Sequence, residues 1–171
     1  MNIVIIGYRG TGKTVVGKLL SRQLGIPYMG MDANIEKRAG MPIPEIVARD
    51  GWSRFRDLES EEARNLAAQD NIIIDTGGGI IERPENMDFL KSYARVFWLK
   101  ASVDTIVSRI QEGTQRPALT DGKTFTEEVE EVLTERIPKY KTAADYEIDT
   151  DQLTSEQVAD CIVDIWKGRQ L

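Results

Sequence analysis

The chain has 171 residues and no histidine, and its 22 Lys and Arg against 28 Asp and Glu give a formal net charge of −6. This length predicts one domain with a sizeable core, and the acidic balance argues against partners such as nucleic acid or an anionic membrane. The lack of histidine excludes histidine general bases, Ser-His-Asp triads and histidine metal sites. One cysteine, Cys161, excludes an intrachain disulfide. With no signal-type or membrane-length apolar run, we expect a soluble, cytoplasmic protein.

The first fourteen residues carry the most specific motif. A buried strand is predicted over Ile3–Ile6 and a helix over 13–24, and between them the chain reads GYRGTGKT. This is the pattern G-x-x-x-x-G-K-[ST] in the strand–loop–helix context of a phosphate-binding P-loop. Its glycines let backbone N–H groups face an anion, its lysine approaches the β- and γ-phosphates, and its threonine hydroxyl can ligate Mg²⁺. The predicted ATP-binding residues here are Gly10, Thr11, Gly12, Lys13, Thr14 and Val15, with Lys13 also catalytic and Thr14 also a metal ligand.

Short apolar runs alternate with helical patterns along the chain. The runs are continuous, as expected for strands covered on both faces, so their order predicts an α/β domain with a mainly parallel sheet. Strands are expected over 3–6, 28–31, 72–74, 96–99 and 146–148. Helices are expected near 13–24, 34–39, 44–49, 53–69, 84–93, 103–111, 126–142 and 155–167. Ligands bind beyond the carboxyl ends of such strands, so the residues after each strand are candidate site residues.

Acidic residues and glycines follow the second and third strands. Asp32 is predicted to be a helix N-cap, a carboxylate facing a γ-phosphate and an acceptor hydroxyl, or both. Asp75 precedes three glycines at 77–79, which form either a tight turn or a bare backbone surface that admits a ligand. Because other P-loop proteins hold Mg²⁺ through an aspartate after a buried strand, Asp75 is a candidate metal residue.

Three arginines are candidates for binding anions. Arg56 lies in a predicted helix, Arg116 in the aperiodic stretch Gln111–Thr126, and Arg136 just before Pro138, where a helix should end or kink. Each arginine taken singly is compatible with a solvated surface position. Arginine is nevertheless the side chain that binds carboxylates through two hydrogen bonds and stabilises a transferring phosphoryl group.

Together these features resemble the shikimate kinase family over nearly the whole chain. The similar stretches, in order, are GYRGTGKT, DANIEKRAGMPIPEI, FRDLE, TGGG, RPAL and ERIPKY. The resemblance implies a three-layer α/β/α P-loop kinase core with a five-stranded parallel sheet and a mobile lid. It implies one domain over residues 1–171, with a substrate-binding region at about 32–60 and a lid at about 111–124. The implied reaction is ATP- and Mg²⁺-dependent phosphorylation of the shikimate 3-hydroxyl in aromatic amino-acid biosynthesis, and we expect a monomer.

The resemblance also implies roles for individual residues. In the acid-binding part of the site, Asp32 would contact the shikimate hydroxyls, Arg56 and Arg136 would bind its carboxylate, and Gly78 and Gly79 would line the pocket. Asp32 would therefore be both catalytic and substrate-binding.

The remaining implied roles concern the nucleotide. Arg116, on the lid, would reach the phosphates as a catalytic and ATP-binding residue, and Arg109 would pack on adenine. The stretch Asp149–Leu153 would border the adenine.

The chain departs from the family after the second strand. The family commonly has D-x-D there, whose first aspartate helps to hold Mg²⁺ through water, whereas this chain reads Gly30-Met31-Asp32. The family usually has no acid before TGGG, but this chain has Asp75. The hypothesis is that Asp75 supplies the charge missing at Gly30. Two alternatives stay open: another P-loop small-molecule kinase, acting on gluconate or a nucleoside, and a nucleotide-binding module with weak catalysis.

Overall fold

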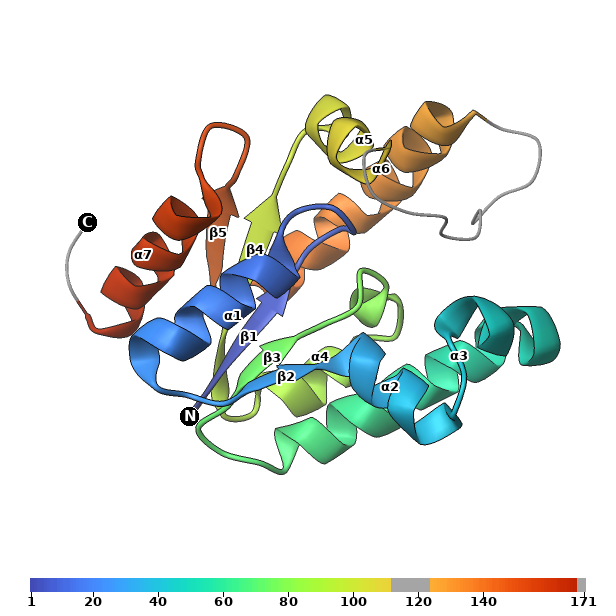
Figure 1. Ribbon diagram of the computed structural model, residues 1–171, viewed down its shortest axis with the longest axis horizontal. Helices are drawn as coiled ribbons and strands as arrows, with labels where there is room; N and C mark the ends of the chain where they lie inside the picture. The colour runs from blue at the N-terminus through green and yellow to red at the C-terminus, as the bar shows by residue number, and fades with distance from the viewer. Residues whose placement is uncertain (112–123, 169–171) are drawn as a thin grey trace.

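The computed structural model describes residues 1–111 and 124–168, which form a sheet flanked by helices (Figure 1). The strands are β1 (Asn2–Ile6), β2 (Tyr28–Gly30), β3 (Ile73–Asp75), β4 (Ala94–Lys100) and β5 (Tyr146–Asp149). The helices are α1 (Lys13–Leu24), α2 (Met31–Ala39), α3 (Ile43–Ala67), the 3-10 turn η1 (Ile80–Glu82), α4 (Pro84–Lys91), α5 (Val103–Gln111), α6 (Phe125–Ala143) and α7 (Ser155–Trp166). The predicted lid, apart from its two ends, lies outside the described residues, as does Arg116.

All five strands are parallel, in the order β2-β3-β1-β4-β5. The central strand, β1, is therefore flanked by β3 on one side and β4 on the other, and all its residues are buried. The connection from β1 leads to β2 and the connection from β3 leads to β4, so they leave these neighbouring strands in opposite directions. This topological switch point opens a crevice at the carboxyl ends of the strands. The predicted five-stranded parallel sheet is confirmed.

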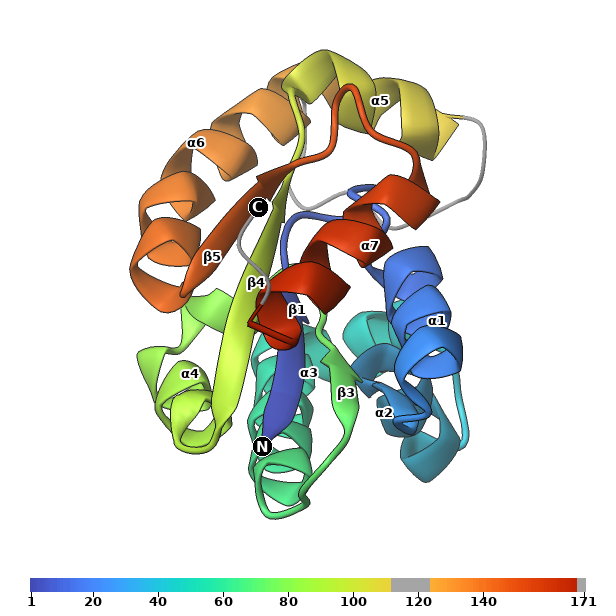
Figure 2. The same ribbon diagram turned by 90° about the vertical axis from the view of Figure 1, so that its left-hand side faces the viewer.

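Helices cover both faces of this sheet. Ile3 and Ile5 of β1 pack in a cluster with α1 and α7, whereas Val4 and Ile6 pack in a cluster with α3, α4 and α6. Figure 2 shows α1 and α7 on one side of the strands and α4 and α6 on the other. Because successive side chains of a strand point to opposite faces, one apolar strand contributes to both cores. The three-layer α/β/α architecture is confirmed.

The start of α2 differs from the prediction. The helix begins at Met31 rather than near 34, and its N-cap residue is Gly30, so Asp32 is not the N-cap. Asp32 lies in the first turn instead, where its negative charge still interacts favourably with the helix dipole.

Two later helices contain a residue that interrupts the regular helical pattern. The predicted helices 44–49 and 53–69 both belong to α3, which is interrupted at Gly51 by a non-helical conformation with φ 83° and ψ 168°. The helix predicted near 126–142 is α6, which continues through Pro138 to Ala143 rather than ending there. Pro138 costs one helical hydrogen bond, and the burial of Tyr140 and Ala143 beyond it offsets that loss. Within the described ranges, none of the helices is both long and apolar enough to cross a membrane.

Candidate active site

The phosphate loop connects β1 to α1 at the centre of the crevice. Gly10 and Gly12 have φ values of 81° and 92°, a left-handed conformation that strains any residue with a side chain. The first helical hydrogen bond of α1 runs from the Val16 N–H to the Gly12 carbonyl at 3.0 Å. The N–H groups just before Val16 are thus not used within the helix, and they can bind an anion together with the positive end of the helix dipole. Val15, the second residue of α1 after Lys13 and Thr14 open it, is 52% exposed.

The Lys13 ammonium lies inside the phosphate loop. It donates hydrogen bonds to the carbonyls of Gly7 at 2.8 Å and Tyr8 at 2.9 Å, and the residue is only 8% exposed. The hydroxyl of Thr11 also donates to the Tyr8 carbonyl, at 2.8 Å. These bonds stabilise the curved loop and place a positive charge where the terminal phosphates of a nucleotide would bind.

Thr14 and Asp75 meet beside the phosphate loop. The Thr14 hydroxyl donates to Oδ2 of Asp75 at 2.7 Å, and Asp75 is buried at the carboxyl end of β3. A hydroxyl and a carboxylate are hard oxygen ligands of the kind that Mg²⁺ prefers, so these two residues fit the ion. In the described part of the chain no three His, Cys, Asp or Glu side chains converge to hold a metal, so phosphate oxygens and water would complete its shell.

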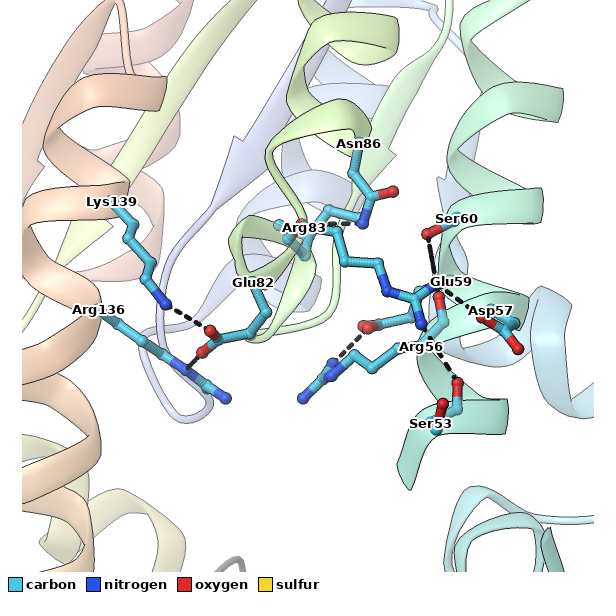
Figure 3. Close-up of polar contacts among 12 residues, drawn as sticks. Ser53, Arg56, Asp57, Glu59, Ser60, Glu82, Arg83, Asn86, Arg136 and Lys139 are labelled. Carbon is cyan, nitrogen blue, oxygen red and sulfur yellow. Dashed lines mark hydrogen bonds and ion pairs between the residues drawn. The ribbon is translucent and has the colours of Figure 1, made fainter. Parts of the chain in front are cut away.

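Arg56 and Arg136 converge on the glycines after β3, although they come from α3 and α6 respectively. A Cβ atom at Gly79 would overlap the guanidinium of Arg56, and one at Gly78 would lie 3.7 Å from Nη1 of Arg136. The same Gly78 Cβ would lie 3.3 Å from the backbone nitrogen of Arg9 in the phosphate loop. Figure 3 shows the guanidinium groups of Arg56 and Arg136 directed toward the same space from opposite sides. The structure therefore brings both arginines to one place next to the phosphate loop.

Each of these arginines is held by a glutamate. Arg56 forms an ion pair with Glu59, and Nε of Arg136 donates to Glu82 at 2.7 Å. Lys139 donates to the other oxygen of Glu82 at 2.6 Å (Figure 3). Burial raises the pKa of Glu59, an effect that the Arg56 charge opposes. Burial alone would also raise the pKa of Glu82, but hydrogen bonds from Lys139 and Arg136 bring it below its ordinary value.

Asp32 faces the same glycine turn. A Cβ atom at Gly77 would lie 2.9 Å from Oδ1 of Asp32 and 2.8 Å from Oε1 of Glu59. A side chain at this position would therefore displace two carboxylates. Of the two alternatives for these glycines, the structure favours a bare backbone surface over a simple tight turn. Asp32, Arg56 and Arg136 surround this surface.

Arg109 lies on the other side of the phosphate loop. Its guanidinium donates to the Gly10 carbonyl at 3.3 Å and to Oγ1 of Thr150 at 3.3 Å, and a further bond reaches the Thr150 carbonyl at 3.2 Å. It thus joins the phosphate loop to the turn after β5, within the stretch predicted to border adenine.

Sequence reasoning missed the two glutamates that orient the arginines, and also Tyr28. Glu59 follows Arg56 by three residues, a spacing that places both side chains on one face of a helix and would have suggested the pair. Glu82 offered no such signal, because its partners are 54 and 57 residues away. The sequence places Tyr28 only in a predicted strand, yet its hydroxyl donates to Asp75 at 2.7 Å.

The fold, with a phosphate loop at the topological switch point of its parallel sheet, defines a P-loop kinase. A family model described as shikimate kinase matches residues 9–167. The chain belongs to the shikimate kinase family.

Relatives along the whole chain support this assignment. The shikimate kinase of Thermodesulfovibrio yellowstonii is 44% identical over 162 residues, covering 95% of this chain and 92% of the relative. The shikimate kinase of Syntrophus aciditrophicus is 41% identical over 174 residues, which cover 95% of this chain and 89% of the relative. Among solved structures, shikimate kinase from Acinetobacter baumannii in complex with shikimate has a TM-score of 0.92 at 30% identity and covers 99% of this chain and 94% of that one. A gluconokinase from Sinorhizobium meliloti, with a TM-score of 0.57 at 16% identity, shares the fold alone.

Proposed function

We propose that the protein transfers the γ-phosphoryl group of ATP to the 3-hydroxyl of shikimate, giving shikimate 3-phosphate and ADP in aromatic amino-acid biosynthesis. The observation that carries this proposal is the convergence of Arg56 and Arg136 on Gly78 and Gly79, beside the phosphate loop. A small hydroxy acid needs cations for its carboxylate next to the phosphate donor, and a neutral acceptor such as a nucleoside does not. The likeness to the A. baumannii enzyme, which binds shikimate, supports the same assignment.

The acid is proposed to bind between the two guanidinium groups. Arg56 and Arg136 would donate charge-assisted hydrogen bonds to its carboxylate, and the bare backbone of Gly78 and Gly79 would lie against its ring. Asp32 would accept hydrogen bonds from its ring hydroxyls. These residues and those around them form the proposed substrate-binding region of a single domain.

ATP is proposed to bind with its phosphates in the loop from Gly10 to Thr14. Backbone N–H groups from Thr11 to Val15 would donate to the phosphate oxygens, and Lys13 would exchange its two carbonyl partners for the β- and γ-phosphates. Arg109 would pack on the adenine. Arg116, on the proposed lid, would reach the phosphates; it lies outside the described residues.

Thr14 and Asp75 are proposed to hold Mg²⁺. Their 2.7 Å hydrogen bond directs the Thr14 hydroxyl hydrogen toward Asp75 and leaves oxygen lone pairs for a metal. Bound there, Mg²⁺ would neutralise charge that develops on the phosphate oxygens during transfer.

The transfer is proposed to be an in-line displacement. The shikimate 3-oxygen forms a bond to the γ-phosphorus as the bond to the bridging oxygen breaks, and ADP leaves. The hydroxyl proton passes to the Asp32 carboxylate, and the Lys13 ammonium neutralises charge on the transferring group. We also propose that the enzyme acts as a cytoplasmic monomer.

The deciding experiment measures ADP release, coupled to an indicator enzyme, with Mg²⁺, ATP and a panel of acceptors. Shikimate should support turnover at least about 100-fold above gluconate, quinate, a nucleoside or no acceptor, because only the matching acid satisfies the buried charged groups. Equal ADP release without acceptor, or a preference for a neutral acceptor, would contradict the proposal.

Replacing Arg136 by lysine should raise the KM for shikimate about 10-fold or more and change kcat little. An ammonium cannot reproduce the paired hydrogen bonds of a planar guanidinium to a carboxylate. Steady-state kinetics at saturating ATP would measure this. Arg95→Lys is a matched control, because Arg95 donates to the carbonyls of Ile165 and Trp166 away from the site. An equal rise in the KM for ATP would show that the loop, rather than acid binding, had been disturbed.

A further inference from the structure

The ring of Tyr28 is packed between two glycines near the metal-binding residues. A Cβ atom at Gly17, on α1, would lie 2.7 Å from Cε2 of Tyr28, and one at Gly30 would lie 3.0 Å from its hydroxyl oxygen. A Cβ atom at Gly17 would force the ring to move, and one at Gly30 would press on its hydroxyl. The ring therefore fits closely against two positions that lack side chains.

The hydroxyl of Tyr28 and that of Thr14 share one acceptor. Each donates to Oδ2 of Asp75 at 2.7 Å. Two short hydrogen bonds, from Tyr28 on β2 and from Thr14 on α1, hold the Asp75 carboxylate in a single orientation.

The strand register explains why the hydroxyl is available there. Gly30 pairs with Asp75, and Tyr28 with Ile73, on the parallel strands β2 and β3. Residues two apart on a strand point to the same face, so Tyr28, Gly30 and Asp75 all face α1. A side chain at position 30 would enter the space that the Tyr28 hydroxyl occupies.

We infer that Tyr28 is a positioning residue for the magnesium–nucleotide site: its hydroxyl holds the Asp75 carboxylate against Thr14, and Gly17 and Gly30 make room for its ring. This inference rests on one part of the proposed function, namely that Thr14 and Asp75 hold Mg²⁺. Groups that orient metal-bound side chains commonly change metal affinity or activity 10- to 100-fold when removed.

The test compares wild type and Tyr28→Phe by isothermal titration with ATP, once with Mg²⁺ and once with EDTA. This variant keeps the ring between the glycines and removes only the hydroxyl. We expect the affinity for Mg·ATP to fall about 10-fold and the affinity for ATP in EDTA to stay within about 2-fold. The KM for shikimate should not change. Tyr146→Phe is the matched control, because Tyr146 also begins a strand but stacks on Phe97, away from Asp75.

A double-mutant cycle separates positioning from packing. If Tyr28 acts through Asp75, Tyr28→Phe should have no further effect on Mg·ATP affinity in an Asp75→Asn background. Equal losses with and without Mg²⁺, no loss at all, additive losses in the cycle, or a wild type whose ATP affinity ignores Mg²⁺ would each overturn the inference. The titrations and the double-mutant cycle use no acceptor, so their outcomes are independent of whether shikimate is the substrate.

Discussion

Replacing Lys13 by methionine should lower kcat about 1000-fold or more, with a smaller loss of ATP affinity. The methionine keeps the length of the side chain but removes the charge that would neutralise the transferring phosphoryl group. Loss of one preorganised donor to a transition state costs about 10²–10³ in rate, and the lysine contributes a full charge as well. Single-turnover measurement of ADP formation would record the effect.

The interpretation of Lys13 depends on the loop staying folded. In the structure its ammonium also bonds the carbonyls of Gly7 and Tyr8, so thermal unfolding of the variant should be measured alongside the kinetics. Lys37→Ala, an exposed lysine on α2, is the control and should retain wild-type turnover. A folded Lys13 variant with turnover within 10-fold of wild type would exclude the proposed role.

Replacing Asp32 by asparagine should lower kcat about 100- to 10,000-fold at saturating shikimate. Asparagine keeps the shape and one acceptor oxygen, but it can no longer take the proton of the reacting hydroxyl. The affinity for Mg·ATP, measured by titration without acceptor, should stay near that of wild type. This combination would assign Asp32 to the transfer step rather than to nucleotide binding.

A matched carboxylate is available as a control for Asp32. Asp57, on α3, accepts a hydrogen bond from Arg83 at 2.8 Å. The variant Asp57→Asn should leave kcat within about 3-fold of wild type. If Asp32→Asn changed only the KM for shikimate, the residue would bind the acid without assisting proton transfer. Loss of helical content in this variant would instead point to its place in the first turn of α2.

Most of the fold could be predicted because local patterns and burial agree. The apolar run Ile3–Ile6 is buried on both faces, as a central parallel strand requires. Tertiary packing decides where local signals leave alternatives. Pro138 is compatible with a helix end or a kink, and buried residues on both sides of it keep α6 packed on the sheet. The N-cap role, one of the alternatives for Asp32, falls to Gly30, because β2 runs directly into α2.

The candidate site could be predicted in part. The phosphate loop is contiguous, so its residues and spacing identify it without a structure. The convergence of Arg56 and Arg136 depends on the packing of α3 and α6, and no local pattern reports it. The contact of Tyr28 with Asp75 spans 47 residues and is made beside glycines on α1 and at the end of β2, so it was visible only in three dimensions.

The ion pairs around the proposed acid-binding pocket have a consequence for how a substrate would arrive. The formal charges of its cations, Arg56, Arg136 and Lys139, are cancelled by those of Asp32, Glu59 and Glu82. A pocket without net charge in an acidic protein exerts little long-range attraction on an anion, since steering requires an uncompensated field. Capture of the acid should therefore be slow relative to the diffusion limit and almost insensitive to ionic strength, with discrimination arising only at contact.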